Sequence, residues 1–499
     1  MLKSTVISIL RSFTKEEIIK FDDFLKSPYF NKKSAVPLLY AAIKKHYPGL
    51  DSPELEKEKL WCVIHPAREY NYGVMKNLIH ELTKLAEQFI TQEEYRQNEI
   101  QEFANLYKAI ANRNLKTVLD NKGKNLEKVS GDDYLKKINI PIEEYFHMMA
   151  KVYETKVWNT HFHALKVSSV EDRYLTEDNF ITGMLIHLIT INYSTNLFSL
   201  DVKNKTDIDN AAAVILESIT DGNFEKILGF IRKRSEAKYI ILKCYLLAYK
   251  AYCKNGKTED LMRLKDYFYS NSSVMPVLTI RDMDVILVNT FSLMKDFTGD
   301  KDKELREVYK FKIKNELILD RNRQINSLQF IPWLVIFFEE EQADDLRLFI
   351  NHYSKFLIES DKNDSLLLAE SIYNILKNDF GNALSLLSRV KFDSFVLKNL
   401  IKKLTLLIYY EMQDYELFLQ SCDAHNHFLN YAEKENKVER HDNIKRTREL
   451  MKSVNSLYIL RDNPTKEKIH YIESEVHNLK MDFKKWFLRK IEELKNSSR

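Results

Sequence analysis

The sequence predicts an all-α protein, in which an N-terminal helical bundle precedes an α-solenoid, an array of stacked helix pairs. Three observations support this prediction. The 499 residues include only 10 glycines and 9 prolines, about 4% where average usage is about 12%, so few tight turns are expected. Apolar residues recur at helical spacing along most of the chain. A helix–turn–helix pattern returns at nearly regular intervals in the second half, as in a repeat array.

The composition and charge indicate a folded cytoplasmic protein. Hydrophobic residues make up 44% of the chain and charged residues 30%, enough for a large core. The net charge of +4 does not indicate a polyanion partner. The four cysteines, which are widely spaced and form no CxxC pair, fit reduced thiols: Cys62, Cys244, Cys253 and Cys422. No signal peptide is apparent, and the longest apolar run, 330–338, is far shorter than the ~20 residues of a membrane span.

The first predicted domain, residues 1–97, is the helical bundle. Thr14 and Glu17 form a capping box that opens a helix ending near Lys26. Five prolines between 28 and 66 predict short helices there. A longer helix over about 73–92 presents one apolar face, made of Met75, Leu78, Ile79, Leu82, Leu85 and Phe89.

The second predicted domain, residues 98–235, is a central helical region. Its helices are expected over about 98–118, 141–165, 175–198, 207–219 and 223–234. Residues 119–140 contain two glycines and many charges, which predicts a loop.

The third predicted domain, residues 236–430, contains the repeats. Helices over 237–254, 366–377 and 398–412 are each followed by a polar turn and an amphipathic helix. The turns fall at Lys257, Lys301, Gln342, Asp379 and Asp414, so the intervals are 44, 41, 37 and 35 residues. Tetratricopeptide repeats have a period of 34 residues. The segments 379–383 and 414–418 resemble the turn of that repeat, and we interpret these units as degenerate tetratricopeptide-like helix pairs.

The last predicted domain, residues 431–499, consists of capping helices. It holds 17 Lys and Arg against 12 Asp and Glu. A helix is expected to begin at Asn463-Pro464, with one apolar stripe of Ile472, Val476, Leu479, Phe483 and Trp486. This stripe fits a terminal cap on the array, or equally a dimer seam.

Two segments resemble a known family. Residues 12–17 (SFTKEE) with 24–31 (FLKSPYFN), and later Tyr409-Tyr410-Glu411 with Asp414-Tyr415-Glu416, are similar to an uncharacterised all-helical, tetratricopeptide-like family of Bacteroidota and related bacteria. The resemblance implies a helical architecture and a cytoplasmic bacterial setting, and it implies no activity, catalytic residue or cofactor.

The motifs of common enzymes are absent from the sequence: it has no GxxxxGK[ST], GxGxxG, HExxH or GxSxG. Cys422, His425 and His427 are the best metal-like cluster, with His441 as a possible fourth ligand. On a helix, His427 points away from His425, so we favour a core cysteine with solvated histidines. His161 and His163 diverge on a helix in the same way.

Charged clusters offer two further sites. Glu339-Glu340-Glu341 with Asp344-Asp345 could hold a divalent cation, but without a glycine-containing loop we favour a solvated repeat turn. Cations that could contact phosphate are grouped at Arg232-Lys233-Arg234, Arg321-Asn322-Arg323, Lys445-Arg446-Arg448, Lys484-Lys485 beside Trp486, and Arg489-Lys490. We interpret most of them as a solvated charged face.

These observations favour a non-enzymatic interaction or scaffold protein that binds a peptide or a partner helix on its repeat surface. We expect no catalytic, metal or cofactor site. The alternative is a nucleic-acid-associated regulator that uses the basic C-terminal helices, and an enzyme of unfamiliar type is the third possibility.

Overall fold

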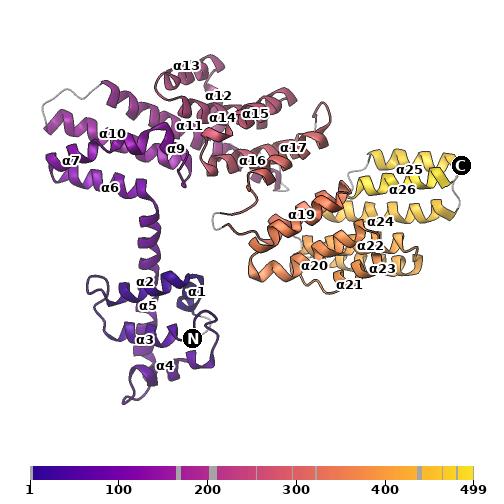
Figure 1. Ribbon diagram of the computed structural model, residues 1–499, viewed down its shortest axis with the longest axis horizontal. Helices are drawn as coiled ribbons and strands as arrows, with labels where there is room; N and C mark the ends of the chain where they lie inside the picture. The colour runs from indigo at the N-terminus through magenta and orange to yellow at the C-terminus, as the bar shows by residue number, and fades with distance from the viewer. Residues whose placement is uncertain are drawn as a thin grey trace. The chain divides into compact units, whose positions relative to one another are not determined.

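The computed structural model describes residues 4–163, 170–201, 211–253, 256–294, 296–320, 323–434, 441–462, 465–478 and 482–497. Throughout these ranges the regular elements are helices (Figure 1), and β structure is limited to one isolated bridge between Ile325 and Leu357. The prediction of an all-α protein is confirmed. No helix in the described ranges is both long and apolar enough to cross a membrane.

The chain divides into two compact units. The first contains residues 1–187, 221–243 and 270–280, and the second contains residues 188–220, 244–269 and 281–499. Four helices contribute residues to both units: α11 (Val170–Asp201), α14 (Glu236–Tyr252), α15 (Thr258–Asn271) and α16 (Val277–Leu293).

The first unit begins with short helices around a shared core, whose buried residues run from Val6 to Phe89. Thr14 and Glu17 form the predicted capping box, because the Thr14 hydroxyl accepts the Glu17 N–H and the Glu17 carboxylate accepts the Thr14 N–H. The elements of this unit are α1 (Thr5–Ser12), α2 (Lys15–Lys26), α3 (Ala35–Lys44), η1 (Pro53–Leu55), α4 (Lys57–Ile64), α5 (Tyr72–Gln97), α6 (Glu99–Asn112), α7 (Lys116–Gly123), α8 (Leu126–Ser130), α9 (Asp132–Leu135), α10 (Ile142–His163), α13 (Asp221–Arg232) and η2 (Ser272–Val274).

The predicted loop over 119–140 is wrong, since most of it lies in the short helices α7, α8 and α9. Each of these helices contains one buried leucine: Leu119 in α7, Leu126 in α8 and Leu135 in α9. The Tyr145 hydroxyl on α10 also donates to the Val129 carbonyl at 2.9 Å. Tertiary packing therefore supplies what the polar, glycine-containing sequence lacks in helix propensity.

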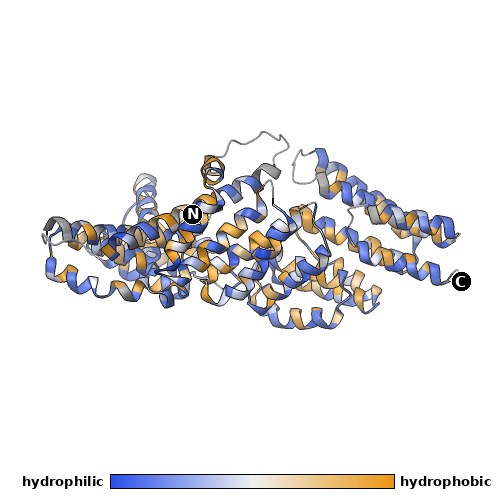
Figure 2. Ribbon diagram, turned by 90° about the horizontal axis from the view of Figure 1, so that it is seen from above, coloured by the Kyte–Doolittle hydropathy of each residue, from blue (hydrophilic) through white to orange (hydrophobic). Residues whose placement is uncertain are grey.

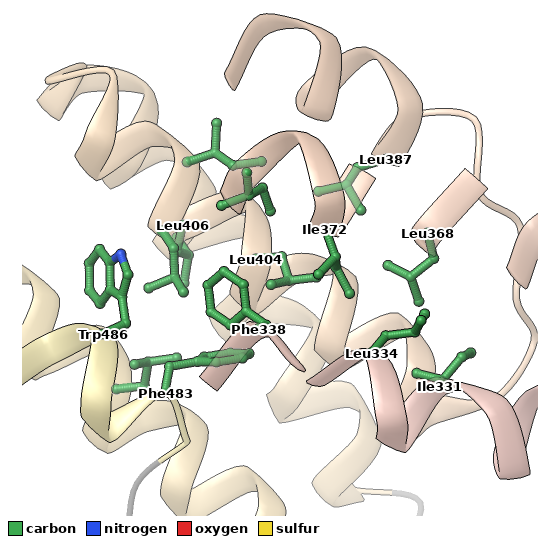
Figure 3. Packing of buried hydrophobic residues seen from close by; sticks show 14 of the residues in the cluster. Ile331, Leu334, Phe338, Leu368, Ile372, Leu387, Leu404, Leu406, Phe483 and Trp486 are labelled. Atoms are coloured by element: carbon green, nitrogen blue, oxygen red, sulfur yellow. The ribbon is translucent and has the colours of Figure 1, made fainter. Parts of the chain in front are cut away.

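The second unit contains the rest of the helices: α12 (Ala211–Ser218), α17 (Lys301–Lys314), α18 (Ser327–Glu339), α19 (Ala343–Tyr353), η3 (Ser354–Phe356), α20 (Glu359–Leu376), α21 (Phe380–Leu387), α22 (Phe395–Glu411), α23 (Tyr415–Lys434), α24 (His441–Asp462), α25 (Lys466–Asn478) and α26 (Lys484–Ser497). From α18 to α24, each helix packs on the next, and α18 also packs on α20 and α22 on α24. One continuous core joins these helices (Figure 3), so that Leu334, Ile372, Leu404 and Trp486 belong to the same cluster. Hydrophobic and hydrophilic residues alternate along the helices (Figure 2), as amphipathic packing requires.

Glycine-free turns explain how the chain reverses direction with so few glycines. Residues with positive φ stand immediately before the predicted turn positions Gln342, Asp379 and Asp414, at Glu341 (57°), Asn378 (60°) and Gln413 (62°). In each turn, this residue donates its N–H three residues back and the next residue donates five residues back. That is the Schellman pattern, which usually has glycine at the left-handed position. Asn114 and Glu316 make the same two bonds.

The prediction of one C-terminal helix through residues 472–486 is wrong. Two helices, α25 and α26, pack against each other (Figure 1), and Phe483 between them has a φ of 59°. Val476, Phe483 and Trp486 are buried within the unit, so they are not available as a dimer seam. Asn463, Pro464 and Leu479 lie outside the described residues.

Candidate binding groove

An open groove with an apolar floor lies in the second unit, between α17 and α19. Its volume is about 600 Å³. The floor is formed by Ile313 of α17, Phe337 of α18, and Phe349 and Tyr353 of α19. The remaining lining residues are Lys310, Lys314, Glu316, Gln342, Asp345, Leu348 and His352.

Helical spacing places these side chains along the groove. Lys310, Ile313 and Lys314 are at positions i, i+3 and i+4 of α17, and Asp345, Leu348, Phe349 and His352 are at i, i+3, i+4 and i+7 of α19. Residues with these spacings share one face of a helix. Each helix therefore contributes one wall.

Aromatic packing holds the floor in place. Phe349 lies 5.3 Å from Phe337 and 4.9 Å from Tyr353 between ring centroids. The Tyr353 hydroxyl donates to the carbonyl oxygen of Ile313 at 3.1 Å, which connects α19 to α17. The floor is therefore preformed, so binding does not have to order these side chains.

Leu348 is the apolar residue of the groove that is open to solvent, with 67% of its surface exposed. A leucine that becomes fully buried gains about 1.5–3 kcal/mol. Since the floor beside it is already aromatic, an apolar side chain placed here would cover Leu348 and the floor together. This is the anatomy of a hot spot, an apolar centre with a polar rim.

The rim is charged differently on its two walls. Lys310 and Lys314 are exposed on the α17 wall, and within the described residues neither ammonium forms an ion pair with a carboxylate. Asp345, likewise exposed and without an ion pair in those ranges, lies on the α19 wall. Glu316 is different, because it already pairs with Arg323 at 2.8 Å and lies 3.7 Å from His352.

The predicted acidic turn is solvated only in part. Glu341, Asp344 and Asp345 are exposed, but basic residues near the C-terminus pair with Glu340 and Glu341. Glu340 contacts Lys485 at 2.5 Å and Glu341 contacts Arg489 at 2.6 Å. Burial raises the pKa of Glu339 to about 7, although its carboxylate accepts backbone N–H groups of Phe483 and Lys485, which favour the charged form. Asp344 pairs with Lys377 at 3.1 Å.

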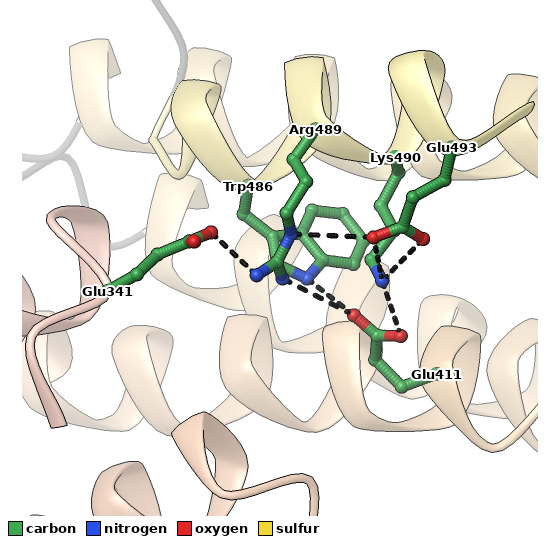
Figure 4. A network of polar contacts seen from close by, with 6 residues as sticks. All are labelled: Glu341, Glu411, Trp486, Arg489, Lys490 and Glu493. Atoms are coloured by element: carbon green, nitrogen blue, oxygen red, sulfur yellow. Dashed lines mark hydrogen bonds and ion pairs between the residues drawn. The ribbon is translucent and has the colours of Figure 1, made fainter. Parts of the chain in front are cut away.

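Glu411 completes this contact between distant helices (Figure 4). It accepts the indole N–H of Trp486 at 2.8 Å and pairs with Lys490 at 2.8 Å, while Glu493 also contacts Lys490 at 2.9 Å. Three cations of α26 that could have met phosphate, Lys485, Arg489 and Lys490, thus contact carboxylates instead. These ion pairs count against the nucleic-acid alternative, which needs those cations free for phosphate.

Other predicted basic residues are also paired. The Nε and Nη2 atoms of Arg234 donate to the two carboxylate oxygens of Asp178, each at 2.5 Å. Arg232 pairs with Glu236 at 3.0 Å, and Arg448 pairs with Glu433 at 2.9 Å. Arg321 and Asn322 lie outside the described residues. These paired arginines therefore do not form a row of free cations along one surface.

Among the side chains that the structure describes, histidine and cysteine do not meet as metal ligands. No group of three His, Cys, Asp or Glu side chains suitable for a metal occurs in the described part of the chain. His425 is buried rather than solvated, and its Nε2 lies 2.6 Å from the Asn399 side-chain oxygen. Burial and the neighbouring Lys402 and Lys403 lower its pKa to about 3, so it is neutral. The side chains of His161, His163 and His441 lie outside the described residues.

Comparison with known proteins adds no relative: no protein-family model, curated protein or solved structure matches the chain.

The groove was not among the sites that the sequence suggested. Its residues are spread over three helices, and the pattern that could have indicated it was Leu348 on the otherwise polar side of α19.

Proposed function

We propose that this protein is a non-enzymatic interaction protein, and that the α17–α19 groove binds an amphipathic helix of a partner protein. The observation that carries the proposal is the exposed Leu348 beside a preformed aromatic floor. The proposal retains the view of the second unit as tetratricopeptide-like helix pairs, with the regular turns at 341, 378 and 413 in its support. Helix pairs of this kind present surfaces that suit a partner helix.

A helix is the expected ligand because the groove cannot satisfy an extended backbone. Both walls are helices, and the described residues contain no strand whose edge could pair with a peptide. A bound segment must therefore satisfy its own N–H and C=O groups, which an α-helix does. Its apolar residues at i, i+3 and i+4 would meet Leu348 and the floor.

Charge specifies the rest of the ligand. Acidic residues along one edge of the partner helix would face Lys310 and Lys314, and a basic residue along the other edge would face Asp345. This arrangement also fixes the direction of the helix in the groove.

The test first selects helical peptides of this pattern that bind the full chain. It then compares the affinity of a selected peptide for two variants of the protein. Leu348→Glu places a charge in the groove and should weaken binding more than tenfold. Leu328→Glu changes a leucine of similar exposure, 62%, that does not line the groove, and should leave the affinity unchanged. Equal affinities for both variants would overturn the proposal.

A charge-reversal pair makes the test specific. Lys310→Glu with Lys314→Glu should weaken an acidic-edged peptide, and changing the acidic edge of that peptide to lysine should restore binding. If the double variant weakens the acidic-edged peptide and the lysine-edged peptide does not restore the affinity, the assigned orientation is contradicted.

A further inference from the structure

A separate cavity of about 320 Å³ lies in the second unit, where the ends of α11, α14 and α16 meet. Its lining residues come from the last turns of these helices and the residues that follow: Tyr193, Asn196, Leu197, Ala251, Tyr252, Cys253, Gly256, Thr290, Leu293, Met294 and Asp296. Its size is at the lower end of the range of small-molecule sites, about 300–1,000 Å³.

The electrostatics of the cavity favour a positive charge. The C-terminal ends of α14 and α16 line it, and the C-terminus of a helix carries a partial negative charge. The lining residues include one carboxylate, Asp296, and no Lys, Arg or His. Asp296 has no ion pair within the described residues.

One cation of the chain already uses the same property. The Lys301 ammonium donates to the carbonyl oxygens of Ser292 at 3.2 Å and Met294 at 2.9 Å, at the end of α16. Lys301 does not line the cavity. The contact demonstrates that carbonyl groups at this helix end accept an ammonium group.

Two tyrosines offer their rings rather than their hydroxyls. The Tyr252 hydroxyl donates to Ile189 at 2.7 Å, and the Tyr193 hydroxyl accepts the Asn289 side-chain N–H at 2.9 Å. The two rings meet edge to face with centroids 5.1 Å apart. Since the hydroxyls are occupied, the rings are the part available to a ligand, and a ring face attracts an organic cation.

Thr290 indicates where a ligand would form a hydrogen bond. It lines the cavity and is only 5% exposed, yet its hydroxyl has no hydrogen-bond partner. A buried hydroxyl without a partner is destabilising, and a polar group of a ligand would supply the missing hydrogen bond.

Gly256 shapes the wall of the cavity. A Cβ atom at this position would lie 2.2 Å from the Ala251 carbonyl oxygen, so only glycine permits this close approach to the end of α14.

We propose that this cavity binds a small organic cation, a substituted ammonium that also carries a hydroxyl group. The ammonium would lie against the tyrosine rings and Asp296, and the hydroxyl would bond to Thr290. This site does not involve the α17–α19 groove, so each proposal can fail without the other.

The test measures binding of three probes to the full chain by titration calorimetry. Choline has both the charge and the hydroxyl, tetramethylammonium has only the charge, and dimethylbutanol, with tert-butyl in place of trimethylammonium, has only the hydroxyl. Choline should saturate one site and bind at least about threefold tighter than dimethylbutanol, from the cation–ring attraction. No saturable choline binding at millimolar concentrations, or equal affinity for dimethylbutanol, would overturn the proposal.

Two variants assign the contacts. Thr290→Val should weaken choline and dimethylbutanol by about two- to tenfold, the worth of one hydrogen bond, and leave tetramethylammonium unchanged. It should not lower the melting temperature of the unliganded chain, because it removes a hydroxyl without a partner. Asp296→Asn should weaken choline by about two- to fivefold, while the exposed control Asp393→Asn should have no effect. Unchanged choline affinity in both cavity variants would place the probe elsewhere and contradict the proposal.

Discussion

Removing the Glu411 carboxylate should loosen α26 much more than removing the neighbouring Glu493 carboxylate. Both side chains contact the Lys490 ammonium, at 2.8 and 2.9 Å. They differ in burial, since the Glu411 side chain is 13% exposed and that of Glu493 is 54% exposed. Glu411 alone also accepts the Trp486 indole N–H.

The magnitude follows from what each substitution leaves behind. Glu411→Ala leaves the buried indole N–H without its acceptor and Lys490 with only its exposed partner, a cost of about 1–3 kcal/mol. Glu493→Ala leaves the inner pair intact, and an exposed pair contributes at most about 1 kcal/mol. Glu411→Gln should fall between them, because its amide oxygen can still accept the indole N–H.

Amide hydrogen exchange of residues 484–497 is the suitable assay, because it reports local opening rather than unfolding of the whole chain. Glu411→Ala should speed exchange in α26 by about 5- to 150-fold, and Glu493→Ala by at most about fivefold. If Glu493→Ala had the larger effect, or Glu411→Ala had none, our assignment of Glu411 as the main contact of α26 would be refuted.

Two other predictions concern stability. Gln413→Gly should stabilise the fold by about 0.5–1 kcal/mol, because glycine has no penalty for the left-handed conformation at 62°. Asn378→Gly should stabilise it less, because asparagine tolerates this conformation. Urea midpoints in the reverse order would contradict the reasoning. His425 should lower stability in acid, since its pKa is about 3 in the folded state and about 6.5 in the unfolded state. Between these values the unfolded state binds more protons, so stability falls as pH decreases from about 6.5 to 3. His425→Gln retains a donor for Asn399 and should flatten that part of the pH–stability curve; an unchanged curve would indicate that His425 does not contribute.

Local patterns identified the helices well, because apolar spacing and caps act over a few residues. The capping box at Thr14 and Glu17, and the turns before Gln342, Asp379 and Asp414, were correctly predicted for this reason. The loop predicted over 119–140 failed because packing of three leucines outweighs a polar, glycine-containing sequence.

Contacts between distant segments were not predictable in the same way. The stripe through 472–486 keeps helical spacing, yet the chain turns at Phe483, and Val476, Phe483 and Trp486 are buried within the unit. The acidic turn at 339–341 appeared solvated because two of its cations, Lys485 and Arg489, lie more than 140 residues later in the chain. Both the groove and the cavity combine residues from three helices, so neither forms a motif along the sequence.

A hydrogen-exchange footprint of a bound amphipathic peptide on the full chain tests the proposed function most directly. We predict slower exchange in residues 310–316 and 342–353, with no slowing at these positions in Leu348→Glu. Slowing confined to other helices, or a footprint that is unchanged in Leu348→Glu, would contradict the assignment of the α17–α19 groove as the binding site.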